Sequence, residues 1–148
     1  MRTPDLNDAV NDLMDLEFAG ERRCRVSAEL VKAPPLQAQL LLRAAEHLAD
    51  AERLRSLVIE MRGTPHSGET TATLADPVHY VPRVDGGGDR ELLEACIAEQ
   101  DADVAQCDKL LQTEGVPERV KSVVGQCREA AVARQRGLGD MRVQLQMG

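Results

Sequence analysis

The sequence predicts an all-α protein, a bundle of four long helices that forms one domain over residues 1–148. Apolar residues recur with helical spacing over four long stretches, which indicates four amphipathic helices. The chain contains one Phe, one Tyr and no Trp. A core without aromatic side chains must be built from Leu, Val, Ala, Met and Cys, and such a core suits close helix packing better than a β-sandwich. The chain is long enough to bury a core of this kind.

Prolines and glycines mark where each predicted helix begins and ends. Thr3 is a candidate N-cap and Pro4 suits the first helical position. Consecutive prolines, Pro34 and Pro35, end the first helix, and Gly63 suits the C-terminal end of the second. The predicted helices span residues 4–32, 35–62, 89–113 and 117–145.

The links between these helices predict the topology. The first two helices, and likewise the last two, are joined by very short links, so each pair should form an antiparallel hairpin. Residues 64–88 form a much longer crossover between the hairpins. The second helix is roughly 40 Å long at 1.5 Å per residue. Because an extended crossover easily spans that length, we expect the second and third helices to run parallel.

Composition excludes several classes of partner. The formal net charge is −7, so the chain should repel the phosphates of a nucleic-acid duplex, and it has almost no aromatic residues on which single strands stack. No apolar run approaches the ~20 residues needed to cross a bilayer. The N-terminal sequence MRTPDLNDAVND is acidic, unlike a secretory signal. We therefore expect a cytoplasmic protein that binds neither nucleic acid nor membrane.

Polar residues interrupt the apolar face of every predicted helix near its midpoint. Since the midpoints of neighbouring helices coincide in an antiparallel bundle, these residues are predicted to form one buried polar layer. The alternative is that their side chains lie at the edge of each face and extend to water. The residues of the predicted layer are Glu17, His47, Gln100, Asp103 and Arg134.

Two stretches carry a resemblance to a known family. They are residues 6–57, which begin LNDAVNDLMDLE, and residues 92–126, LLEACIAEQDADVAQCDKLLQTEGVPERVKSVVGQ. Over most of the chain outside the crossover, the sequence resembles a bacterial ferritin-like four-helix-bundle family of unknown function. The resemblance implies a ferritin-like fold and no assigned activity.

A di-iron centre is not predicted, although some ferritin-like proteins hold one. Those proteins use a Glu from each of two helices and a Glu-x-x-His from each of the other two. Glu17 suits the first position, but Ala44 precedes His47 where Glu is required. Arg134 stays protonated and does not bind metal, so we expect it to pair with Glu17 and Asp103. We expect no metal, no cofactor and no enzymatic activity; the alternative is a ferroxidase-type protein that holds iron through Glu17, His47 and Asp103.

The cysteines raise a second alternative. Cys24, Cys96, Cys107 and Cys127 form no CxxC pair, and no histidine lies at zinc-ligand spacing from them. We expect four reduced, buried thiols that pack as small apolar groups. A thiol-based redox sensor is the alternative, and it requires two cysteines that face each other across helices.

The second predicted helix is apolar on nearly all sides, which indicates burial on two sides. Either the crossover or a second subunit covers its outer face. We expect both, with a homodimer formed through the helix at residues 35–62 and the crossover. The sequence thus predicts a structural or protein-interaction module whose protein partner it does not identify. The outer face carries Leu41, Leu42, Ala45, Ala49 and Ile59, and the covering residues of the crossover are Leu74, Val78, Tyr80 and Val81.

Overall fold

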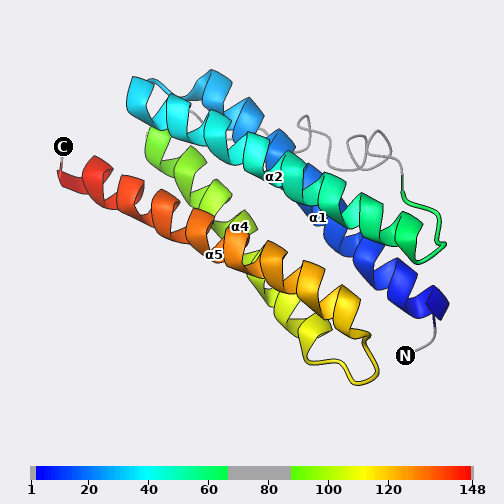
Figure 1. Cartoon of the computed structure of the whole chain (residues 1–148). Helices are drawn as coiled ribbons and strands as arrows, with labels where there is room; N and C mark the ends of the chain where they lie inside the picture. The colour runs from blue at the N-terminus through cyan, green and yellow to red at the C-terminus, as the bar shows by residue number, and fades with distance from the viewer. Residues whose placement is uncertain (1–2, 67–87, 148) are drawn as a thin grey trace.

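The computed structural model describes residues 3–66 and 88–147, and these residues form four long helices (Figure 1). No strand occurs in these two ranges, so the predicted all-α four-helix bundle is confirmed. Most of the predicted crossover lies outside the described residues, and so do the four crossover residues that were predicted to cover the outer face of the second helix. The helices are α1 (Thr3–Leu30), α2 (Pro34–Glu60), α4 (Asp89–Leu111) and α5 (Glu118–Met147).

The helices are arranged as two hairpins laid side by side. Helix α1 packs along α2 and α4 along α5, while α1 also contacts α4 and α2 also contacts α5. Figure 1 shows that α2 and α4 run in the same direction and that every helix is antiparallel to the neighbours it contacts. The predicted topology of two antiparallel hairpins is therefore confirmed.

Several helix ends differ from the predicted ones because local capping decides them. Helix α2 ends at Glu60, and Arg62, not Gly63, takes the left-handed conformation with φ 62°. The amide of Gly63 then donates to the carbonyl of Val58 at 2.9 Å. At the other end of the bundle, Asp89 accepts hydrogen bonds from the backbone amides of Lys32 and Ala33, at 2.7 and 2.9 Å. Asp89 thereby fixes the turn between α1 and α2 to the start of α4.

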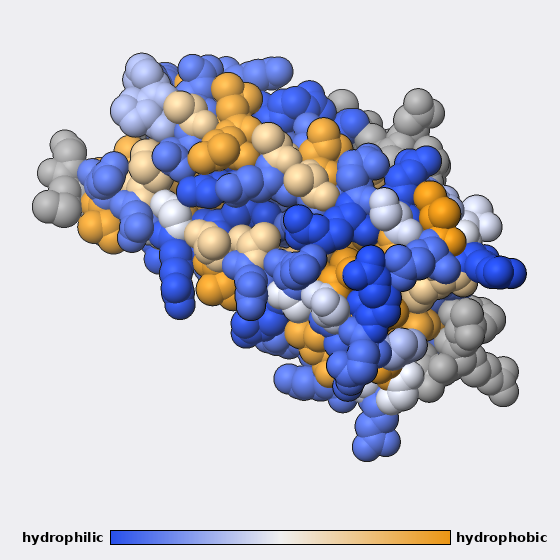
Figure 2. Space-filling model, in the orientation of Figure 1, coloured by the Kyte–Doolittle hydropathy of each residue, from blue (hydrophilic) through white to orange (hydrophobic). Residues whose placement is uncertain are grey.

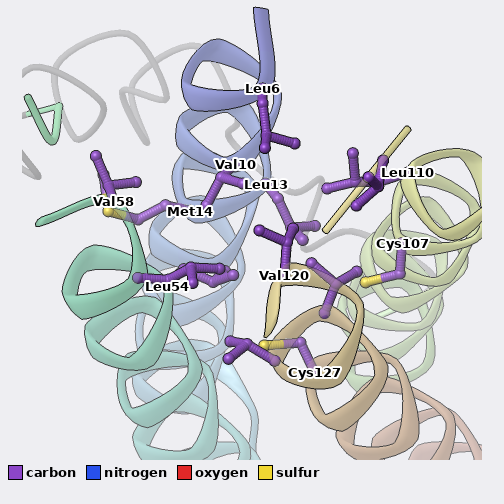
Figure 3. Close-up of a cluster of buried hydrophobic side chains, with 14 of the residues drawn as sticks. Leu6, Val10, Leu13, Met14, Leu54, Val58, Cys107, Leu110, Val120 and Cys127 are labelled. Carbon is purple, nitrogen blue, oxygen red and sulfur yellow. The ribbon is translucent and has the colours of Figure 1, made fainter. Parts of the chain in front are cut away.

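The buried apolar side chains form two clusters, one toward each end of the bundle. The first contains Leu13, Leu54, Val124 and their neighbours, and Figure 3 shows how its side chains from all four helices converge. The second contains Leu40, Leu93 and their neighbours. In the described part of the chain, no helix combines the length and apolar character needed to cross a membrane.

Candidate functional site: a buried polar layer

Between the two apolar clusters, all four helices contribute polar side chains to the interior. None of these side chains belongs to a residue more than 3% exposed, so the layer is shielded from water. Helices α2 and α4 each contribute two residues spaced three apart, which places both on the same helix face. The layer consists of Glu17 from α1, His47 and Asp50 from α2, Gln100 and Asp103 from α4, and Arg134 from α5.

Arg134 is the centre of the layer. Its Nη1 donates to Asp50 Oδ2 and its Nε donates to Gln100 Oε1, both at 2.9 Å. Its Nη2 donates to Glu17 Oε2 at 3.4 Å and lies 4.0 Å from Asp103 Oδ2. The guanidinium therefore faces all three carboxyl groups and is held most closely by Asp50.

Asp50 was not predicted from the sequence as a residue of the layer. It lies three residues after His47, and this i, i+3 spacing was the available signal. Its carboxyl group is shared, because Asp50 Oδ1 also accepts from Arg53 at 3.1 Å near the surface. Asp50 thus links the buried layer to the edge of the bundle.

Gln100 connects Arg134 to His47 and fixes the state of the imidazole. A guanidinium has only donors, so the Gln100 atom that faces Arg134 is the carbonyl oxygen. The amide nitrogen of Gln100 therefore faces His47 Nε2, 2.6 Å away. Since that nitrogen donates, Nε2 accepts and the ring proton lies on Nδ1. His47 Nδ1 is directed toward Glu17 Oε1 at 3.5 Å and Asp103 Oδ2 at 3.6 Å.

Gly20 makes room for this imidazole. A Cβ atom placed on Gly20 would lie 2.7 Å from His47 Nε2, with other ring atoms closer still. Real Cβ atoms do not approach other atoms this closely, and the interior is too densely packed for the ring to move aside freely. Gly20 on α1 is therefore part of the layer although it has no side chain.

The carboxyl groups of the layer differ in protonation. Burial and the charge of Glu17 raise the pKa of Asp103 to about 11, and they raise the pKa of Asp50 to about 7. Burial disfavours the ionised form of Glu17 too, but its contacts with His47 and Asp103 and the charge of Arg134 bring its pKa below the usual value. At neutral pH, Glu17 is thus the main counter-charge of Arg134, and Asp103 is protonated.

Three residues of the layer have the donor atoms of a metal site. Glu17, His47 and Asp103 each offer one ligand atom, and these atoms lie within 4.8 Å of one another. Within the described residues, His47 Nδ1 and both oxygens of Asp103 have no hydrogen-bond partner. Two carboxylates and an imidazole suit divalent iron, manganese or zinc.

The surrounding residues do not fit a di-iron centre. On α2, Ala44 stands where a Glu-x-x-His motif that ends at His47 would have its Glu. On α4, the two residues at this spacing are Gln100 and Asp103, so the motif is absent there too. On α5, Ala131 and Arg134 stand at that same spacing, with neither Glu nor His. Arg134 thus places a permanent positive charge in the layer, facing Glu17.

A single ion is also opposed by the hydrogen bonds of the layer. Binding at His47 Nδ1 requires the ring proton to leave that atom, and in a neutral imidazole the proton then lies on Nε2. Gln100 must then turn its oxygen toward His47, and its amide group would face the Nε–H of Arg134, donor against donor. The residues present therefore fit a metal-free network better than a resident metal.

The four cysteines are buried free thiols. Contact with Cys24 lowers the pKa of Cys96 against the effect of burial, and the same contact raises the pKa of Cys24. Cys96 also donates to Ser27 Oγ at 3.7 Å. Burial raises the pKa of both Cys107 and Cys127. The redox alternative stays a hypothesis, and Cys24 and Cys96, on α1 and α4, are the pair at which it is best tested.

Fold and layer together define a ferritin-like four-helix bundle with an arginine-centred polar layer. The chain belongs to the family DUF2383, a domain of unknown function, whose model matches residues 5–114. One similar solved structure is a dodecameric thioferritin, the bacterioferritin-related protein from Bacteroides fragilis. The two sequences are 15% identical, the match covers 99% of this chain and 89% of the thioferritin chain, and the TM-score is 0.81. That likeness shows the fold alone. A search of curated proteins gives no match.

Proposed function

We propose that this protein is a non-enzymatic structural module that associates with itself through the outer face of α2. The observation that carries the proposal is the distribution of exposed apolar side chains. Among the described residues, six large apolar side chains are exposed, and four of them belong to α2. When several apolar side chains are exposed on one element of a protein, they often form an interaction site. The four are Leu41, Leu42, Leu48 and Ile59.

The polar layer supports a structural role in place of catalysis. Arg134 satisfies the carboxyl groups with its own charge, and Gln100 holds His47 in the tautomer that does not bind metal at Nδ1. A buried polar group of this type favours one helix register over others, because a shifted register leaves charges unpaired. The layer thus keeps α2 in the position that presents its outer face.

Two further observations are consistent with this proposal. The solved structure of similar fold is described as dodecameric, so bundles of this shape are able to assemble. The four cysteines are free thiols, which suits a reducing compartment, and we propose the cytoplasm.

Light scattering with size-exclusion chromatography tests the proposal. We expect the wild-type protein at micromolar concentration to have at least twice the monomer mass, and we expect Leu41→Lys/Leu48→Lys to be monomeric with unchanged helix content. Val143→Lys is the matched control, because Val143 is also an exposed apolar residue, 51% exposed, but lies on α5. A monomeric wild-type protein, or an α2 variant that associates as the wild type does, would contradict the proposal.

Metal binding is the second candidate function, favoured by the three donor atoms of Glu17, His47 and Asp103. In that case these residues would hold one divalent ion, which would supply Lewis acidity or a redox electron to the bundle interior. Retention of stoichiometric metal after desalting, abolished by His47→Ala, would make this candidate the leading one.

A further inference from the structure

The outer face of α2 has a regular pattern that is not evident from its apolar residues alone. Six exposed residues recur at alternating spacings of four and three, the spacing of a helix-pairing seam. The seam is apolar toward both ends and charged between them. Figure 2 shows apolar side chains gathered along α2 on the face turned to the viewer. The seam consists of Leu41, Ala45, Leu48, Glu52, Arg55 and Ile59.

The two charged residues of the seam are available for a partner. Both are exposed, and neither takes part in any ion pair or hydrogen bond found among the described residues. Elsewhere on α2, by contrast, Arg43 pairs with Glu46 and Arg53 pairs with Asp50. A charged pair in the middle of an apolar seam lets a partner be selected by charge as well as by shape.

We propose that a second copy of this chain packs its α2 antiparallel against the part of the seam from Leu48 to Ile59, with the two-fold axis between Glu52 and Arg55; Leu41 and Ala45 then lie beyond the end of the partner's α2. This inference rests on the self-association proposed above and specifies its geometry. In this register Glu52 faces the partner's Arg55, and Arg55 faces the partner's Glu52. Leu48 faces the partner's Ile59 on one side, and the symmetry repeats that contact on the other. The interface is isologous, with two charged layers between two apolar layers.

Charge selects this orientation over the parallel one. In a parallel pair of α2 helices, Glu52 would face the partner's Glu52 and Arg55 the partner's Arg55. Like charges placed opposite each other disfavour association, whereas the antiparallel register pairs opposite charges twice. The competing antiparallel register has its two-fold axis at Ala45, so that the apolar half of the seam packs on itself.

Cysteine cross-linking separates these registers. The native thiols are buried, so a new exposed cysteine reacts first. Leu48→Cys/Ile59→Cys should give a covalent dimer under mild oxidation. Each single variant should not, because Leu48 and its symmetry mate are about 16 Å apart along the helix axis. Ala45→Cys should also stay monomeric on a non-reducing gel, since the two Ala45 positions are about 25 Å apart. A dimer of Ala45→Cys, with none for the double variant, would overturn the inference.

Charge exchange gives a second, independent test. We expect Glu52→Arg and Arg55→Glu each to weaken the dimer about tenfold, because each change sets two like-charged pairs in the interface. The combined Glu52→Arg/Arg55→Glu variant restores opposite charges, and we expect its dimerisation constant to return to within about threefold of the wild type. If the double variant is as weak as the singles, or if no variant changes the constant, the register is wrong. Self-association that is lost in Leu41→Lys/Leu48→Lys would then still support the proposed function.

Discussion

The polar layer and the apolar clusters on either side of it stabilise the bundle in different ways. In the clusters, contacts are non-directional, and side chains such as Leu13 and Leu54 contribute through the area they bury. In the layer, contacts are directional, and Arg134 donates hydrogen bonds to groups from each of the three other helices. The clusters therefore tolerate exchange of apolar residues of similar size. The layer does not tolerate it, because removal of one partner leaves another buried charge or hydrogen-bonding group unpaired.

The largest effect is expected for Arg134→Leu. The substitution leaves Glu17 and Asp50 buried without their counter-charge, and losing one partner of a buried pair costs about 3–5 kcal/mol. Urea unfolding followed by circular dichroism measures the loss. Arg119→Leu is the control, because Arg119 pairs with Glu60 at the surface and its loss should leave the unfolding midpoint unchanged. An Arg134→Leu protein of unchanged stability would show that the layer is not held by this residue.

A matched pair of methionine substitutions compares the two regions directly. Gln100→Met keeps the shape of the side chain but removes the acceptor for Arg134 and the donor to His47, so we expect a loss of about 2–4 kcal/mol. Leu13→Met lies in an apolar cluster and should cost less than about 1.5 kcal/mol. Chemical denaturation of both proteins in the same buffer gives the comparison. Equal losses would mean that the layer behaves as ordinary core.

Glycine substitutions test the packing around the imidazole. Gly20→Ala places a methyl group against the His47 ring, and overpacking of this kind costs about 1–3 kcal/mol. Gly125→Ala is the control because open space surrounds its Cβ position; in a helix interior it should stabilise the protein by about 0.5–1 kcal/mol. Thermal unfolding should therefore shift in opposite directions for the two variants. A stabilised Gly20→Ala protein would place His47 elsewhere.

The smallest effect at neutral pH is expected for Asp103→Asn. Asp103 has a pKa of about 11 in the fold and is protonated at neutral pH, so the neutral amide is a close substitute. Glu17→Gln removes an ionised partner of Arg134 and should be much more destabilising. Differential scanning calorimetry at pH 7 ranks the two. If Asp103→Asn is as destabilising as Glu17→Gln, Asp103 is ionised in the folded protein at neutral pH.

The same groups give the pH dependence its sign. The pKa is raised in the folded state from 3.8 to about 7 for Asp50 and to about 11 for Asp103. Between the ordinary and the raised value of each group, the folded protein binds more protons than the unfolded chain. Stability from these groups is therefore present at low pH and falls as the pH rises through this window. Glu17, with its lowered pKa, acts in the opposite sense only below its ordinary value of 4.5. We expect the urea midpoint to fall from about pH 5 to pH 9, and to fall less in Asp103→Asn.

Sequence patterns predicted the fold and most of the layer because both depend on helical periodicity. The topology was predicted from Pro34, Pro35 and the length of the crossover. The layer was predicted because Glu17, His47 and Arg134 each lie near the middle of a helix, which places them at the same level of an antiparallel bundle. Asp50 was not identified, because its position three residues after His47 is shared by many surface residues. The tautomer of His47 depends on the distance and orientation of Gln100 from another helix, and periodicity contains no such information.

Anaerobic titration with Fe(II) shows whether Arg134 and Gln100 keep the layer free of metal. The wild type, His47→Ala and His66→Ala would each be loaded, desalted and analysed for iron; His66, which pairs with Asp15 at the surface, controls for adventitious histidine binding. We expect far less than one iron per chain in all three proteins. One iron per chain in the wild type and in His66→Ala, lost in His47→Ala, would show that the layer is a metal site.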